Sequence, residues 1–258
     1  MNSIELIKKI EGKYKKEAAL DWDNVGFLVG RKEKEIQIIY IALDSTNETI
    51  EHAIFHKADM LITHHPILFD SIKSVTNMDL IGGKILTLIQ QDISCYAAHT
   101  NYDVLTMADL AAKKLGMKET RVLDVTDKEE NKGIGRIGNL DRCLTLGEIA
   151  EIVKERFHLS HVKIFGDNNQ KIKTVALSPG SGKGMTKIAL EEGAEVLISG
   201  DIDHHTGIDS VDMGLSIIDA GHYGLEHIFI EDMEEFLMQI SDDFVIVKEP
   251  LMEPFQIV

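Results

Sequence analysis

The chain carries one strand–helix–strand pattern twice, and this repetition constrains its fold more than any other feature. In the first half, an apolar run at 36–43 precedes a helix-like segment at 47–57 and a second apolar run at 60–62. In the second half, apolar runs at 174–178 and 194–199 flank a helix-like segment in the same way. Such alternation is typical of parallel sheets with helices on their faces. We therefore predict an α/β fold made of two similar units.

Polar, histidine-rich segments follow the predicted strands. Asp44 follows the first strand, and Pro66 ends the segment after the second. Further predicted strands lead to polar segments near 99 and 222. Six of the eleven histidines lie after predicted strands: His64, His65, His99, His204, His205 and His222. Because ligands gather at the carboxyl ends of parallel strands, we expect these side chains to share a functional edge.

The spacing His-x-x-x-acid occurs after two matched strands, at His99–Asp103 and at His222–Glu226. Two consecutive imidazoles at a strand end cannot both point into a core, so one must face a polar centre. Imidazoles mixed with carboxylates, without sulfur ligands, suit Zn, Fe, Mn or Ni. Two ions about 3.5–4 Å apart could be held there, and water bound to such a pair becomes a nucleophile near neutral pH. This chemistry indicates hydrolysis at carbon or phosphorus.

Two further segments each permit two interpretations. Trp22, the only tryptophan, lies in a polar loop that is either a simple turn or the wall of a pocket. The glycine-rich segment 178–184 is either a flexible turn or a cradle for an anion, although it lacks the spacing of a phosphate-binding loop. The charged segment 124–133 has no apolar periodicity and is predicted to be a linker or exposed loop.

Charge, cysteine content and hydropathy argue against several classes of protein. A net charge of −16 argues against nucleic-acid binding, though not against a nucleotide pocket. Cys95 and Cys143 are far apart, which indicates neither a disulfide framework nor a thiolate zinc site. No apolar run is long enough to span a bilayer, and the first residues lack the features of a signal peptide. We expect a cytoplasmic protein with no membrane partner.

Taken together, several motifs resemble one family across essentially the whole chain and in the same order. They are the segments 22–26 (WDNVG), 62–66 (ITHHP), 99–103 (HTNYD), 199–201 (SGD) and 219–226 (DAGHYGLE). This set is similar to the GTP cyclohydrolase I type 2 homologue family, also called NGG-one-interacting-factor-three-like.

The resemblance implies a set of metal ligands for two divalent ions. They are His64, His65, Asp103, His222 and Glu226, with Asp103 expected to bridge. His99 and His205 match further polar positions of the family's site, and we expect them to act as catalytic proton shuttles.

The resemblance also implies a domain organisation. We expect two α/β domains with mostly parallel sheets, the second inserted in the first, and the site in the cleft between them. The first would comprise 1–125 plus 215–258, and the second 126–214. The family forms toroidal hexamers, so a homohexamer is expected.

The implied function is that of a dinuclear-metal-dependent hydrolase. A metal-bound hydroxide would open the imidazole ring of GTP, or of another nucleotide or phosphorylated small molecule, and formate would be released from GTP. One alternative is a hexameric metal-binding regulatory or interaction protein without this activity. Another is a nucleotide-binding module that uses the loop 180–184, with incidental histidines.

Overall fold

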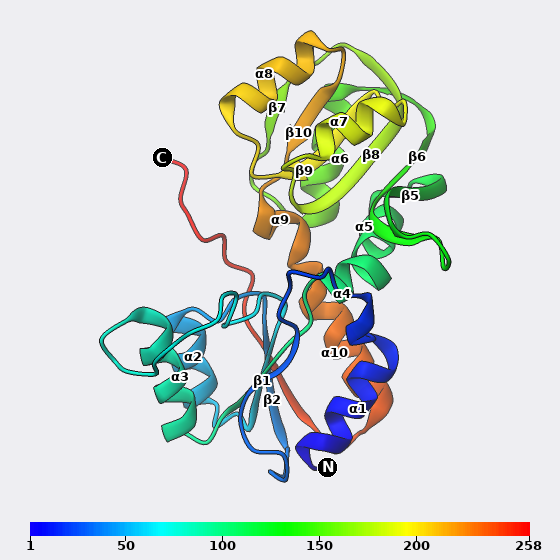
Figure 1. The fold of residues 1–258 in the computed structure, drawn as a ribbon. Helices are drawn as coiled ribbons and strands as arrows, with labels where there is room; N and C mark the ends of the chain where they lie inside the picture. Colours follow the sequence, from blue (N-terminus) through cyan, green and yellow to red (C-terminus); the bar gives the residue numbers. More distant parts are fainter. The chain divides into compact units, whose positions relative to one another are not determined.

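The computed structural model describes residues 1–258, which form two units (Figure 1). The first unit comprises Met1–Tyr102 and Phe229–Leu251, and the second comprises Asp103–Ile228 and Met252–Val258. The first unit is therefore discontinuous in sequence, because the chain leaves it at Tyr102 and returns at Phe229.

The first unit is built on a five-stranded sheet with the order β1-β4-β3-β2-β11. Its strands are β1 (Gly26–Val29), β2 (Ile38–Ala42), β3 (Met60–Thr63), β4 (Ser94–Ala97) and β11 (Val245–Lys248). Its helices are α1 (Ser3–Lys13), η1 (Lys16–Ala18), α2 (Asn47–Phe55), α3 (Leu80–Gln90), α4 (Thr100–Tyr102) and α10 (Ile228–Ile240). All pairings are parallel except that of β1 with β4.

Helices cover both faces of this sheet, with α2 and α3 on one face and α1 and α10 on the other (Figure 1). The three central strands β2, β3 and β4 are buried on both faces and are accordingly mostly apolar rather than alternating. Tyr40 and Leu61 of one face pack with Ile50 of α2 and Leu88 of α3. Thr46 caps α2 by accepting a hydrogen bond from the backbone N–H of Thr49, so the helix begins shortly after β2 ends.

The second unit is built on a six-stranded sheet with the order β5-β6-β8-β9-β10-β7. Its strands are β5 (Lys118–Asp127), β6 (Lys132–Thr145), β7 (Lys163–Phe165), β8 (Lys171–Ser181), β9 (Val196–Gly200) and β10 (Ser216–Asp219). Its helices are η2 (Asp103–Met107), α5 (Ala108–Leu115), α6 (Leu146–Phe157), α7 (Met185–Glu191), α8 (His204–Asp212) and α9 (His222–Glu226). Only β8-β9 and β9-β10 are parallel pairs.

The same parallel three-strand core recurs in both units, as β2-β3-β4 and as β8-β9-β10. The predicted α/β class and the repeated strand–helix–strand plan are confirmed. The first sheet extends this core mostly in parallel. The second is mixed, because β5, β6 and β7 all join it as antiparallel partners.

The boundaries between the units differ from the expected positions at 125/126 and 214/215. Residues 103–125 lie in the second unit because β5 pairs with β6. Residues 215–228 lie there because β10 pairs with β9 and β7.

The segment 124–133, expected to be a linker or exposed loop, is the end of the β5–β6 hairpin. Most side chains of β5 are exposed, so backbone pairing rather than an apolar pattern holds this strand. None of the helices is both long and apolar enough to cross a lipid bilayer.

Candidate metal centre

Strand register places two histidine-bearing segments at one edge of the first sheet. Thr63, the last residue of β3, lies beside Ala42 of β2 and beside Ala97 of β4. The three strands therefore end level with one another. His64 follows β3 directly, and His99 follows β4 by two residues, so both leave the sheet at the same edge.

The three histidines of the first unit converge. Their ring centroids are 4.9 Å apart for His64 and His65, 5.1 Å for His64 and His99, and 5.4 Å for His65 and His99. Each ring offers one nitrogen, and these nitrogens all lie within 4.8 Å of one another. His64 and His99 are buried, and His65 is partly exposed. We expected one of the two consecutive imidazoles to face a polar centre, and the structure brings both of them together with a third ring.

Each of these rings is held by an oxygen acceptor at Nδ1. The bonds join His64 to the carbonyl oxygen of Ala98 (2.7 Å), His65 to Oδ1 of Asp44 (2.8 Å) and His99 to Oδ1 of Asp23 (2.9 Å). Carbonyl and carboxylate oxygens only accept hydrogen bonds, so Nδ1 carries a proton in each ring and Nε2 is the nitrogen that can bind a metal. Metal-ligating histidines characteristically make this second bond, which fixes tautomer and ring orientation.

Asp23 is the most heavily bonded of these acceptors. Its Oδ2 accepts hydrogen bonds from the backbone N–H and from the hydroxyl of Thr100, and its Oδ1 accepts from His99. Burial by itself would raise the pKa of the Asp23 carboxyl, but these bonds outweigh it and hold the pKa at about 2. Asp23 is therefore ionised at neutral pH and fixes the orientation of the His99 ring.

The second unit brings a histidine and two carboxylates together. His222 and Glu226 lie one turn apart on α9, and Nε2 of His222 is 2.9 Å from Oε2 of the buried Glu226. Nδ1 of His222 donates to Oδ2 of Asp201 at 2.8 Å. Asp103, the first residue of this unit, has a carboxylate oxygen within 4.8 Å of one from Glu226. The Nδ1 arrangement of the first unit is thus repeated at His222.

Gly180 makes room for Glu226. A Cβ on this residue would lie 2.2 Å from Oε1 of Glu226 and 3.7 Å from Nε2 of His222. Residues 178–181 are part of β8 rather than a flexible turn. The helix that follows, α7, has only seven residues. The carboxylate nearest to Gly180 is that of Glu226. We therefore infer that glycine is required at position 180 because a side chain there would collide with the carboxylate of Glu226.

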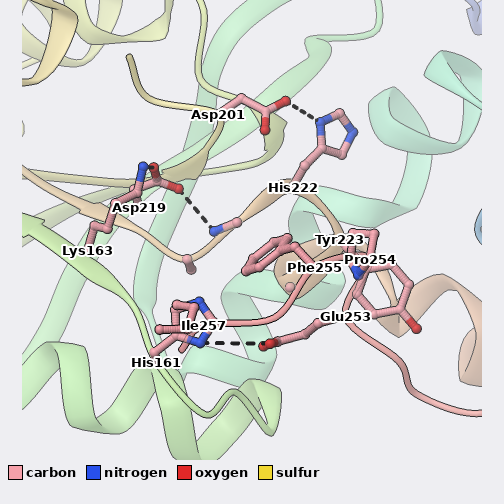
Figure 2. A pocket seen from close by; sticks show the side chains of 13 residues that line it. His161, Lys163, Asp201, Asp219, His222, Tyr223, Glu253, Pro254, Phe255 and Ile257 are labelled. Carbon is pink, nitrogen blue, oxygen red and sulfur yellow. Dashed lines mark hydrogen bonds and ion pairs between the residues drawn. The ribbon is translucent and has the colours of Figure 1, made fainter. Parts of the chain in front are cut away.

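A pocket of 420 Å³ opens beside His222 in the second unit (Figure 2). Lys163 forms an ion pair with the buried Asp219 at 2.6 Å on one side, and the C-terminal segment lines the other side with Phe255. Figure 2 shows the ring of His222 held by Asp201 at the edge of this group. The volume is within the range of small-molecule sites.

The two histidines of α8 lie apart from the group formed by His222 and Glu226. His204 and His205 are exposed in the first turn of this helix and face each other at 5.2 Å between ring centroids. His205 therefore does not join the ligand atoms of His222 and Glu226.

We did not predict from the sequence that Asp23, Asp44 and Asp201 accept hydrogen bonds from histidine Nδ1 atoms. Asp44 and Asp201 each follow a strand, as do the rings they hold. Their position after a strand was the sequence feature from which these two hydrogen bonds could have been predicted.

The donor set fits a divalent transition metal. The first unit offers three imidazoles, and the second offers one imidazole and two carboxylates, so the ligands are nitrogen and oxygen without sulfur, as Zn, Fe, Mn and Ni accept. The space above Gly180 accommodates one of the carboxylates. Both units therefore contain residues that could hold a metal ion.

Comparison with known proteins assigns the chain. Residues 1–249 match the model of Duf34/NIF3 (NGG1p interacting factor 3). The chain belongs to the Duf34/NIF3 family. Relatives named GTP cyclohydrolase 1 type 2 homolog include one from Clostridium perfringens, 35% identical over 92% of this chain and 92% of the relative. Another, from Methanocaldococcus jannaschii, is 32% identical over 94% of this chain and 97% of its own length.

Solved structures share the fold over nearly the whole chain. A hypothetical protein of Staphylococcus aureus matches with a TM-score of 0.90 and 28% identity, covering 100% of this chain and 99% of the other. Reduced HcgD from Methanocaldococcus jannaschii matches with a TM-score of 0.84 and 31% identity, covering 97% and 98%. This Duf34/NIF3 chain therefore has the α/β fold of its relatives from end to end.

Proposed function

We propose that this Duf34/NIF3 protein is a dinuclear-metal-dependent hydrolase that acts on GTP or a related nucleotide. The proposed ligands are His64, His65, Asp103, His222 and Glu226, with Asp103 bridging. The observation that carries the proposal is the oxygen acceptor at Nδ1 of each candidate histidine. This second bond is characteristic of metal-ligating histidines, and it leaves Nε2 to face the ion.

Two divalent ions held by this set would act as Lewis acids and activate water as a nucleophile near neutral pH. The protein's own groups would do the remaining work. Asp44, Ala98 and Asp201 keep their histidine rings oriented so that no ligand reorganises during turnover.

His99 is the proposed proton carrier. Its ring belongs to the cluster of three histidines, and Asp23 accepts from its Nδ1 and stabilises the ring when Nε2 takes up a proton. In the proposed reaction, one water opens the GTP imidazole ring at C8 to a formamide, and a second water hydrolyses this formamide to the free amine and formate. Nε2 of His99 would deliver a proton to the ring nitrogen that leaves C8 in the ring-opening step. His205, also expected to carry protons, lies exposed on α8, and its role stays a prediction.

Metal content and formate release test the proposal. The purified protein is loaded with Zn, Mn or Fe in turn, and bound metal is measured by elemental analysis. We expect two ions per chain, and we expect formate from GTP with at least one metal. Glu226→Gln and His65→Ala should lose bound metal and turnover, whereas His56→Gln, at an exposed site on the surface of the first unit, should retain both.

The possible results are distinct. Two bound ions without formate or any other product from a nucleotide screen would contradict the hydrolase and favour a metal-binding regulatory protein. Full metal content in Glu226→Gln and His65→Ala would contradict the ligand set. Light scattering of the same samples tests the homohexamer that the family resemblance implies.

A further inference from the structure

Two exposed aromatic rings lie together in the first unit. Trp22 is 60% exposed and Phe69 is 50% exposed. Their rings are nearly parallel, with an angle of 12° between the planes and 6.4 Å between the centroids. Phe69 therefore covers only part of the indole face, and the remaining aromatic surface is in contact with solvent.

His99 joins this aromatic pair to the histidine cluster. Its ring is edge-on to Trp22, at 5.9 Å and 73°, and edge-on to Phe69, at 5.4 Å and 75°. The same ring is 5.4 Å from that of His65. The aromatic pair is therefore next to the histidine cluster of the first unit.

Hydrogen bonds next to each ring hold the pair in place. Asp23, adjacent to Trp22, accepts from His99 and Thr100. The side-chain amide of Asn24 donates to the carbonyl oxygen of Leu68, adjacent to Phe69, at 2.7 Å. The loops that carry the two rings are therefore tied to each other and to the histidine edge. Preorganised aromatic faces of this kind favour binding, because little ordering is required when a ligand arrives.

We propose that Trp22 and Phe69 form a stacking site for a planar heteroaromatic ring, such as a purine base, beside His99. This assignment rests on the proposed function, because it gives that site a substrate class. An aromatic face attracts any base through its π surface, so stacking alone does not select guanine. The polar edge of a stacked heterocycle can meet the imidazoles, whereas an aliphatic ligand would leave these polar groups unmatched.

The single tryptophan allows the proposal to be tested without turnover. Trp22 is the only tryptophan of the chain, so its fluorescence reports on this site alone. Guanosine 5′-monophosphate and ribose 5-phosphate are titrated into the zinc-loaded protein. We expect saturable quenching by the nucleotide and none by the sugar phosphate, which has the phosphate but no base. Phe69→Ala should weaken nucleotide binding about tenfold.

Phe55→Ala is the matched control, because Phe55 is also an exposed phenylalanine, with 79% exposure, and lies on α2. It should bind the nucleotide as the unmodified protein does. Equal quenching by both ligands, no quenching by the nucleotide, or equal affinity of the Phe69→Ala and Phe55→Ala variants would overturn the proposal. So would Trp22 emission that changes with protein dilution instead of with nucleotide, which would assign the pair to a contact between copies of the chain.

The two proposals can fail separately. Base-dependent quenching without formate release supports the stacking site and contradicts the GTP-opening activity. Formate release with unchanged nucleotide affinity in Phe69→Ala supports the activity and contradicts the stacking site.

Discussion

Gly180 has no side chain where the carboxylate of Glu226 lies, and an added Cβ would be 2.2 Å from Oε1 of that residue. Gly180 also has φ +80°, a left-handed conformation that residues with a Cβ adopt at a cost. Two separate demands therefore require glycine here, one from the backbone and one from the buried acid.

Substitution of Gly180 separates the two demands. Gly180→Ala should lose about 1–2 kcal/mol of unfolding free energy from its backbone and should also displace Glu226, which lowers bound metal. Gly193→Ala is the control, because Gly193 has φ +82° and no atom within 4 Å of its added Cβ. It should lose comparable stability in urea unfolding and keep its metal. Equal metal content in the two variants would contradict a role for Gly180 at Glu226.

Removal of a histidine's Nδ1 acceptor should weaken metal binding without unfolding the protein. Asp44→Asn and Asp201→Asn replace the acceptors of His65 and His222, so the rings lose their fixed orientation. Metal affinity, measured by competition with a chromophoric chelator, should fall about 10–100-fold. Asp212→Asn, at an exposed position at the end of α8, should bind metal normally. Unchanged affinity in both site variants would show that the hydrogen bonds serve packing alone.

The acid stability of the protein should depend on Asp23. Its pKa of about 2 in the folded state is below the usual 3.8, so folding favours the ionised carboxylate. This contribution is fully present above pH ~4 and is lost as pH falls through ~2. Asp23→Asn should be less stable by roughly 1–2 kcal/mol at neutral pH, with the solvent's screening included.

Urea unfolding of both proteins at several pH values between ~6 and ~2 measures this effect. The difference in unfolding free energy should shrink as the pH decreases, because protonation removes the wild-type advantage. A difference that stays constant through this range would assign the loss to packing rather than to ionisation.

The two cysteines should differ in reactivity. Burial raises the pKa of the Cys95 thiol to about 12, whereas Cys143 is exposed on β6. The thiolate is the reactive form, and Cys95 is neither ionised nor accessible in the fold. We expect a thiol reagent to modify one cysteine per native chain and both after denaturation. Cys143→Ser should show no reactive thiol until it unfolds, and early reaction of this variant would indicate opening of the first sheet.

The parallel core and its histidine-rich edge could be predicted from sequence. The apolar runs at 36–43, 60–62 and 194–199 are short, strongly apolar and followed by polar residues, so strand type and direction follow directly. Strand ends in a parallel sheet share an edge, and this places His64 and His99 together without further information.

The contacts that fix the site depend on residues distant in sequence. Asp23 is 76 residues from His99, and no local pattern pairs them. β5 has mostly exposed side chains, so its membership of the second sheet is determined by backbone pairing with β6. The loop of Trp22 matches the turn interpretation, and the interpretation as the wall of a pocket stays a prediction. Asp23 accepts locally from the N–H of Asn24 as in a turn, while the indole remains exposed beside His99.

The Nδ1 bonds have a consequence for how the protein would acquire the proposed ions. The fold itself sets the tautomer and direction of the His64, His65 and His222 rings, using only groups of the polypeptide. The entropy of ordering these rings is thus lost when the chain folds, not when an ion arrives. We therefore expect that such a scaffold can be emptied and refilled while it stays folded, so that the metal supply of the cell, rather than the folding reaction, would determine which ion it carries.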